Sequence, residues 1–157
     1  MQKYIRSHIV EAKPCTLGEW EQETGRTWNE PDRPRTEEGY KCDYPSGYSG
    51  WCPKGEFDKV SRPIDNMTFG MAIEAMKQGK KVARAGWNGK GMYLWLLPAM
   101  EVKKEWCLDP HLIEAMGDRD TLPCLGSIRM FTATKEVLTG WLASQTDMLS
   151  DDWVIVD

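Results

Sequence analysis

Two short stretches of this sequence combine aromatic, amide and charged side chains at spacings that suit the binding of a flat, charged small molecule. The first stretch spans residues 84–91 and places Trp87 and Asn88 between the cations Arg84 and Lys90. Glycine-rich turns expose backbone N–H groups that can hold an anion, and an indole can stack on a nucleobase. The same residues also suit an ordinary Asn-Gly hairpin whose tryptophan packs on the edge of a sheet.

The second stretch spans residues 141–147 and follows an apolar strand. Its candidate binding residues are Trp141, Ser144, Gln145, Thr146 and Asp147. Hydroxyl, amide and carboxylate oxygens are the groups that recognise ribose hydroxyls and the edges of bases. The alternative is the start of a helix, with Ser144 or Thr146 as the N-cap and Asp147 in the first turn.

The usual catalytic and metal-binding sequence patterns are absent. There is no GxSxG, HExxH or P-loop motif. The two histidines, His8 and His111, have no neighbour that marks either as an oriented general base. The carboxylates of Asp147, Asp151 and Asp152 suit either a divalent ion or the solvation of a turn. The five cysteines lack the close spacing of a zinc site. We therefore expect free thiols, no catalytic residue, no bound metal and no cofactor.

Length and charge narrow the class of protein. A chain of 157 residues, 41% of them apolar, can form one domain or two small ones with a hydrophobic core. The net charge of -4 is spread along the chain, which argues against binding duplex nucleic acid through its phosphates. No window approaches the roughly 18 apolar residues of a membrane span, and the first residues lack the apolar core of a signal peptide. The eight tryptophans indicate either pinned small cores or aromatic walls around a ligand.

Residues 66–157 are expected to form an α+β domain in which one N-terminal helix packs on a mostly antiparallel sheet. Thr68 can cap a helix over residues 68–78, and Gly79 stands where that helix would end. Strands are expected at residues 80–85, 92–97, 127–132, 137–142 and 153–156, with a turn at 87–91 and a short helix at 112–116.

Residues 1–62 are expected to form a small β-rich accessory module, separated from the domain by a break near residues 61–66. Thr16 and Glu19 match a capping box at the start of a short helix. The remaining expected elements are a strand at 4–10, a hairpin formed by 39–44 and 48–52, and a short helix that starts at Pro53.

Three motifs in a fixed order carry a resemblance to a known family. Residues 67–70, 79–92 and 141–153 closely resemble small phage and prophage proteins that include the second type of Thoeris anti-defence protein. The resemblance implies a protein of the bacterial host's cytoplasm that sequesters cyclic ADP-ribose-type signals made by TIR enzymes. Some family members also hold cyclic oligonucleotides. The family binds its ligands intact, in pockets shared between protomers, which implies a homo-oligomer, a dimer or tetramer, and no enzymatic activity.

The resemblance also favours ligand binding, over packing and helix capping alone, as the role of both stretches. It implies that Trp87 lies against or beside the purine, with Asn88 and Gln145 on polar edges, Thr146 and Asp147 on ribose hydroxyls, and Arg84 or Lys90 facing the pyrophosphate. Trp141 and Ser144 complete the expected set. The segment at residues 105–126 is longer than the corresponding segment in the shortest members of the family. Residues 1–62 lie outside the family motifs.

Two other functions remain open at this stage. One is a hydrolase that degrades a nucleotide messenger, with Asp147, Asp151, Asp152 and His111 as the candidate acid or base groups. The other is a phage structural or interaction protein with no small-molecule ligand, in which both stretches serve only packing.

Overall fold

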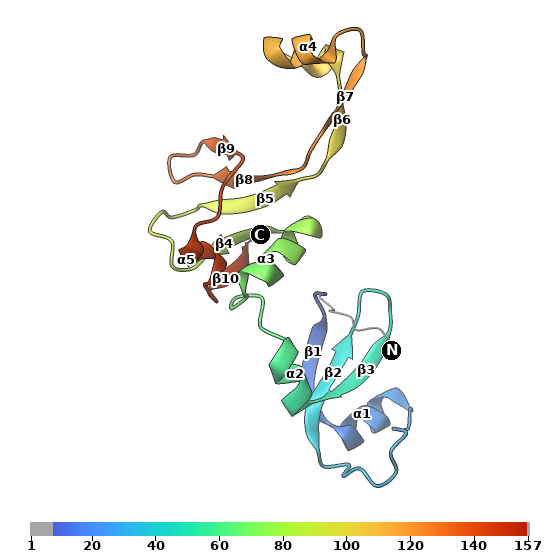
Figure 1. The fold of residues 1–157 in the computed structure, drawn as a ribbon. Coiled ribbons are helices and arrows are strands. Elements are labelled where there is room, and N and C mark those ends of the chain that lie inside the picture. Colours follow the sequence, from blue (N-terminus) through green and yellow to red (C-terminus); the bar gives the residue numbers. More distant parts are fainter. Residues whose placement is uncertain (1–7, 157) are drawn as a thin grey trace. The chain divides into compact units, whose positions relative to one another are not determined.

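The computed structural model describes residues 8–156, which form two compact units (Figure 1). Unit 1 extends to Pro63, and unit 2 begins at Ile64. Unit 1 contains an antiparallel sheet with the strand order β1-β2-β3. Its strands are β1 (Glu11–Thr16), β2 (Glu38–Asp43) and β3 (Ser49–Pro53).

The first strand differs from the one expected from the sequence. Residues 4–7 of the expected strand at 4–10 lie outside the described residues, and residues 8–10 belong to no strand. The strand β1 instead begins at Glu11, because residues 11–16 pair with the complete length of β2. The expected hairpin is confirmed as the antiparallel pair β2 and β3.

Helix α1 (Leu17–Thr24) begins with the expected capping box. The Thr16 hydroxyl accepts a hydrogen bond from the Glu19 amide, and the Glu19 carboxylate accepts one from the Thr16 amide at 2.7 Å. Leu17 and Trp20 of this helix pack with Trp51 to form the core of unit 1. A second helix, α2 (Lys54–Val60), starts after Pro53 as expected.

Unit 2 is built on a five-stranded antiparallel sheet with the order β10-β4-β5-β8-β9. The strands are β4 (Lys81–Arg84), β5 (Tyr93–Leu97), β8 (Ser127–Phe131), β9 (Val137–Thr139) and β10 (Trp153–Val156). Helix α3 (Phe69–Lys77) packs on β10, β4 and β5. The expected α+β class, with one N-terminal helix on a mostly antiparallel sheet, is confirmed.

The sequence signals at both ends of α3 act as expected. The Thr68 hydroxyl accepts a hydrogen bond from the Met71 amide, and Gly79 adopts a φ of 80° just beyond the helix. Beneath α3, Val82, Leu94 and Trp153 are completely buried, so the helix and three strands share one core. Burial of these side chains is the main stabilising term for unit 2.

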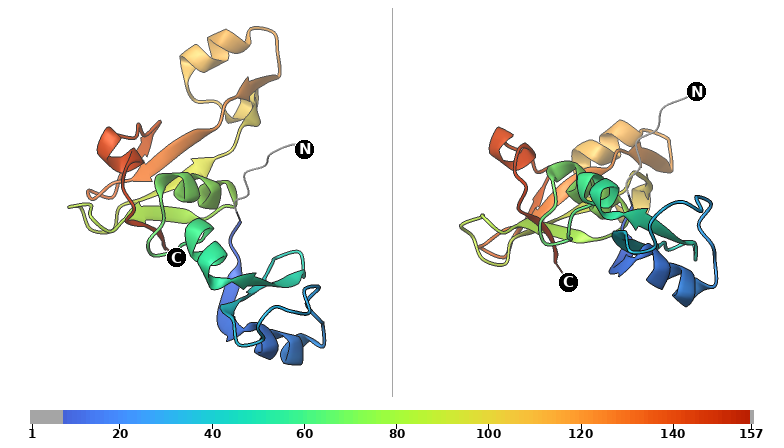
Figure 2. Two further views of the ribbon diagram at one scale, coloured as in Figure 1. Left: turned by 60° about the horizontal axis from the view of Figure 1, so that its bottom comes forward. Right: turned by 90° about the horizontal axis from the view of Figure 1, so that it is seen from below.

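A two-stranded arm extends from this sheet and was not predicted. It consists of β6 (Met100–Lys103) and β7 (Thr121–Cys124), with a 3-10 helix (Lys104–Trp106) and α4 (Pro110–Met116) at its far end (Figures 1 and 2). The expected short helix near 112–116 is confirmed as α4. The strands escaped prediction because β7 contains Pro123 and β6 is largely exposed, so neither has a clear alternation of buried and exposed residues.

All five cysteines are free. Within residues 8–156, no helix has the length and apolar composition needed to span a bilayer.

Candidate functional site

The two stretches singled out in the sequence meet at one end of the unit 2 sheet. The antiparallel register pairs Trp153 at the start of β10 with Arg84 at the end of β4. The loop at residues 85–92 therefore emerges beside the segment that precedes β10, which includes the short helix α5 (Gln145–Met148). The Trp87 indole N–H donates a hydrogen bond to Asp147 Oδ1 at 3.1 Å, which joins the stretches directly.

Arg84 lies at the centre of the contact between the stretches. Its Nη1 donates to Asp147 Oδ1 at 3.0 Å, and its Nε and Nη2 donate to the two carboxylate oxygens of Asp152 at 2.8 and 3.3 Å. The side chains of Arg84 and Asp147 are each only 13% exposed. The guanidinium is therefore already paired with two carboxylates of the same chain.

Asp147 also closes the N-terminus of α5. Its Oδ2 accepts hydrogen bonds from the amide and hydroxyl of Ser144 at 3.1 and 2.6 Å, while the Ser144 hydroxyl accepts one from the Asp147 amide. The capping interpretation of this stretch is thus confirmed, with Ser144 as the N-cap. Partial burial acts to raise the pKa of Asp147, but the hydrogen bonds from Ser144, Trp87 and Arg84 outweigh it and lower the pKa to about 2.

This pKa predicts a pH dependence of stability. Because the pKa of Asp147 falls from an ordinary value of 3.8 to about 2 on folding, its stabilising effect is complete above about pH 4 and is lost as the pH falls toward 2. Asp147→Asn lacks this titrating group. The decrease in its free energy of unfolding on acidification should therefore be smaller by about 1 to 2 kcal/mol, after allowance for solvent screening. Urea unfolding of both proteins at about pH 5 and about pH 2 measures it. An equal decrease in the free energy of unfolding between the two pH values for both proteins would contradict the prediction.

Three tryptophans form an aromatic cluster next to this network. The ring centroids of Trp87, Trp141 and Trp153 lie 5.5 to 6.3 Å apart in edge-on arrangements. Trp153 is completely buried and donates its indole N–H to the Asp147 carbonyl at 2.9 Å, whereas Trp87 and Trp141 are half-buried. One indole therefore anchors the cluster in the core, and two present part of their rings at the surface.

The remaining expected binding residues are exposed and lie on the same two chain segments as Trp87 and Trp141, and we call them the rim. The rim consists of Asn88, Lys90, Gln145 and Thr146. Within residues 8–156, the side chains of these four residues make no hydrogen bond or ion pair. The expected site thus separates into an internally bonded network and a rim whose polar groups are available to a ligand.

The loop that carries Trp87 is longer than the expected turn. It spans residues 85–92, and the left-handed conformation falls on Gly91, with a φ of 75°, while Asn88 and Gly89 do not have positive φ. The expected hairpin is thus confirmed as the antiparallel pair β4 and β5, but Asn88 and Gly89 do not adopt the left-handed conformations of a two-residue Asn-Gly turn. A side chain at residue 89 would collide with Met92 and Ala133, so this glycine lets the loop pack against the turn between β8 and β9.

Asp152 and Trp153 take part in this site although the sequence did not select them. From the sequence, Asp152 is a possible ion ligand or a candidate acid or base group, and Trp153 belongs to a strand and to the third family motif, but neither is among the expected binding residues. The carboxylates of Asp147 and Asp152 both bind the guanidinium of Arg84. Residues 8–156 contain no group of three His, Cys, Asp or Glu residues arranged for a metal ion. The strand register between β4 and β10 was the signal that could have placed Asp152 near Arg84.

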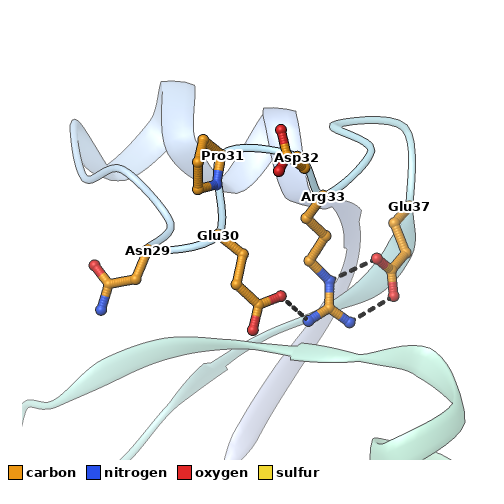
Figure 3. A pocket seen from close by; sticks show the side chains of 6 residues that line it. All are labelled: Asn29, Glu30, Pro31, Asp32, Arg33 and Glu37. Atoms are coloured by element: carbon orange, nitrogen blue, oxygen red, sulfur yellow. Dashed lines mark hydrogen bonds and ion pairs between the residues drawn. The ribbon is translucent and has the colours of Figure 1, made fainter.

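Unit 1 has an open hollow of about 650 Å³ with a charged lining (Figure 3). The lining residues are Asn29, Glu30, Pro31, Asp32, Arg33 and Glu37. Arg33 forms ion pairs with Glu30 and Glu37 at 3.1 and 2.6 Å and lies over the rings of Trp28 and Trp51. This guanidinium is thus already neutralised, and it serves to tie the loop at residues 29–37 to the core.

Comparisons with known proteins converge on unit 2. A family model described as the Thoeris anti-defense 2-like domain matches residues 67–156. Thoeris anti-defense 2 of Bacillus phage SP01 is 38% identical over 90 residues, which cover 57% of this chain and 94% of that protein. The segment matched by the family model runs from the residue before Thr68 through β10 and includes both stretches that form the site.

Proposed function

The chain belongs to the Thoeris anti-defense 2-like family of phage anti-defence proteins, and on this basis we propose that it binds and sequesters a cyclic ADP-ribose-type immune signal without cleaving it. The observation that carries this proposal is the Trp87 to Asp147 hydrogen bond, which joins the two stretches beside two half-buried indoles. Stacking surface next to exposed polar groups suits a ligand with flat bases and many hydroxyls.

The hydrogen bonds within the chain separate the residues proposed to contact the ligand from those proposed to shape the surface. Trp87 and Trp141 stack on the bases of the ligand, Asn88 and Gln145 bind their polar edges, and Thr146 binds ribose hydroxyls. Arg84, Ser144 and Asp147 were expected among the binding residues, but their mutual hydrogen bonds favour a role in shaping the surface.

Charge favours Lys90 over Arg84 for the pyrophosphate. One cation, Arg84, faces two carboxylates, Asp147 and Asp152, so this network carries a net charge of 1 - 2 = -1. A dianionic pyrophosphate is repelled by such a network unless another cation approaches it. Lys90 is exposed and lies in the loop that follows Arg84, six residues further along the chain, so we assign the pyrophosphate to its ammonium group.

The same network argues against a hydrolase. Arg84 lowers the pKa of Asp152, and the pKa of Asp147 is about 2, so both carboxylates are weak general bases at neutral pH. Of the other two candidate groups, His111 lies on α4 at the far end of the arm (Figure 1), and Asp151 is exposed. Sequestration needs no such group.

Sequestration sets a demand on affinity. Lowering the free signal about 100-fold requires free sites at about 100 times the Kd, so a micromolar signal requires nanomolar binding. We propose that a homo-oligomer, a dimer or tetramer, meets this demand by burying more of the ligand between protomers. Leu142 and Leu149 flank α5 and are 89% and 79% exposed, which supports an apolar contact beside the site. Analytical ultracentrifugation of the complete protein tests the oligomeric state.

We further propose that unit 2 alone carries the function, in the cytoplasm of the host cell where the signal is made. The family match is confined to residues 67–156, and the described network lies within this range. A fragment of residues 64–157 is expected to bind the signal with the affinity of the complete chain. A fragment that folds by circular dichroism but binds at least tenfold more weakly would assign residues 1–63 a part in the site.

A thermal-shift panel tests the proposed function. The panel contains cyclic ADP-ribose, its glycocyclic isomers, and cyclic di- and trinucleotides. A tight ligand raises the melting temperature in proportion to the logarithm of its excess over the Kd. We expect the largest shift from a cyclic ADP-ribose isomer. The absence of a shift from every compound would contradict the proposal.

A further inference from the structure

We propose that Asp152 is a positioning residue that sets the affinity for the ligand by holding the Trp87 loop, without touching the ligand itself. The inference rests on the proposed function, because it takes this loop to be part of the binding surface. It concerns a residue that lies outside both stretches selected from the sequence.

Asp152 holds the beginning of the loop through its backbone and its side chain. Its carbonyl accepts a hydrogen bond from the Ala85 amide at 2.9 Å, and its Oδ2 accepts one from the Gly86 amide at 2.8 Å. Its carboxylate also receives Nε and Nη2 of Arg84. The three residues that precede Trp87 are thus all bound to one aspartate, which immediately precedes β10.

Gly86 permits this close approach. A Cβ atom at this position would lie 2.6 Å from Asp152 Oδ2, which is shorter than any ordinary carbon to oxygen contact. The φ of Gly86 is not in the left-handed region, so space, and not backbone conformation, is the reason for the glycine here. The loop and the carboxylate therefore fit together only with glycine at residue 86.

Trp87 is consequently fixed from two directions. Asp147 accepts its indole N–H, and Asp152 holds the backbone immediately before it. Loss of the Asp152 contacts would remove none of the proposed ligand-binding side chains but would let the loop that carries Trp87 sample other conformations. A ligand then has to order the loop on binding, which costs affinity.

The test is calorimetric titration of glycocyclic ADP-ribose into Asp152→Asn, at a temperature at which circular dichroism shows each variant to be folded. The amide has nearly the shape of the carboxylate but carries no charge for Arg84. We expect about tenfold weaker binding. Asp151→Asn is the matched control, because it removes the same charge from the exposed neighbouring residue, and it should bind within about twofold of the unaltered protein.

A double-mutant cycle separates positioning from a general structural effect. If Asp152 acts largely through Trp87, adding Asp152→Asn to Trp87→Ala causes a smaller loss of affinity than Asp152→Asn causes alone. Additive losses, or binding by Asp152→Asn within twofold of the unaltered protein, would overturn the inference. Gly86→Ala displaces the same carboxylate while keeping all charges. It should weaken binding by a similar factor and replaces Asp152→Asn in the test if the latter does not fold.

Hydrogen exchange keeps this inference separate from the proposed function. In Asp152→Asn, the amides of residues 85–91 should exchange at least about tenfold faster, while those of α3 remain unchanged. If glycocyclic ADP-ribose does not bind the unaltered protein, the proposed function fails, and the exchange result still decides whether Asp152 holds the loop. Unchanged exchange in residues 85–91 would refute the positioning role.

Discussion

Replacing Asp147 with alanine is expected to lower the melting temperature of unit 2 by about 10 to 15 °C. This carboxylate accepts hydrogen bonds from Arg84, Trp87 and Ser144, and its removal leaves the Arg84 guanidinium, which is 13% exposed, with one carboxylate instead of two. We expect a cost of about 2 to 3 kcal/mol, which is at or just below the range of about 3 to 5 kcal/mol for fully buried pairs because this network is partly exposed. Differential scanning calorimetry measures the change.

Thr146→Ala is the matched control for this prediction. Thr146 precedes Asp147 on the same short helix, but its side chain is exposed and makes no hydrogen bond within residues 8–156. Its replacement should change stability by no more than about 0.5 kcal/mol. A melting temperature for Asp147→Ala within about 2 °C of the control would show that the network does not stabilise the unit.

Replacing Trp87 with alanine is expected to weaken binding of the cyclic ADP-ribose isomer by about 10- to 100-fold. Stacking of one base on an aromatic side chain contributes about 1 to 3 kcal/mol, and the half-buried Trp87 ring is proposed to supply this surface. Trp87→Phe retains a ring but loses the N–H that Asp147 accepts, so it should retain more affinity than the alanine variant. Calorimetric titration measures both affinities.

Trp106→Ala provides the control for the tryptophan prediction. Trp106 lies in the 3-10 helix of the arm and is 59% exposed, so its loss removes an indole of the same unit away from the proposed surface. Trp106→Ala should bind the cyclic ADP-ribose isomer with the affinity of the unaltered protein. If Trp87→Ala binds as tightly as this control and only melts earlier, Trp87 serves packing alone, as the structural-protein alternative requires.

The elements that follow local rules were predictable from the sequence. Thr16 and Thr68 cap the helices that they were expected to cap, and Gly79 lies at the end of α3. These signals act over one turn of backbone, so a single sequence contains them completely. The chemical types of the site residues were equally readable, because stacking and hydrogen bonding depend on the side chain itself.

The partners of those side chains were not predictable, because they depend on strand register. Asp152 lies 68 residues from Arg84 in the sequence, and only the antiparallel pairing of β4 with β10 brings them together. Asp147 has the carboxylate expected to bind a ribose, but its oxygens bind Arg84, Trp87 and Ser144 of the same chain. A pattern of residue types therefore indicates a polar surface without showing which of its groups remain available to a ligand.

We propose that the protein holds its ligand intact. The most direct measurement incubates the complete protein with glycocyclic ADP-ribose, removes the unbound ligand, denatures the protein and identifies the released compound by mass spectrometry. We predict recovery of the unaltered cyclic molecule in an amount that matches the binding sites. Release of a linear or hydrolysed product, or of no nucleotide at all, would contradict the account.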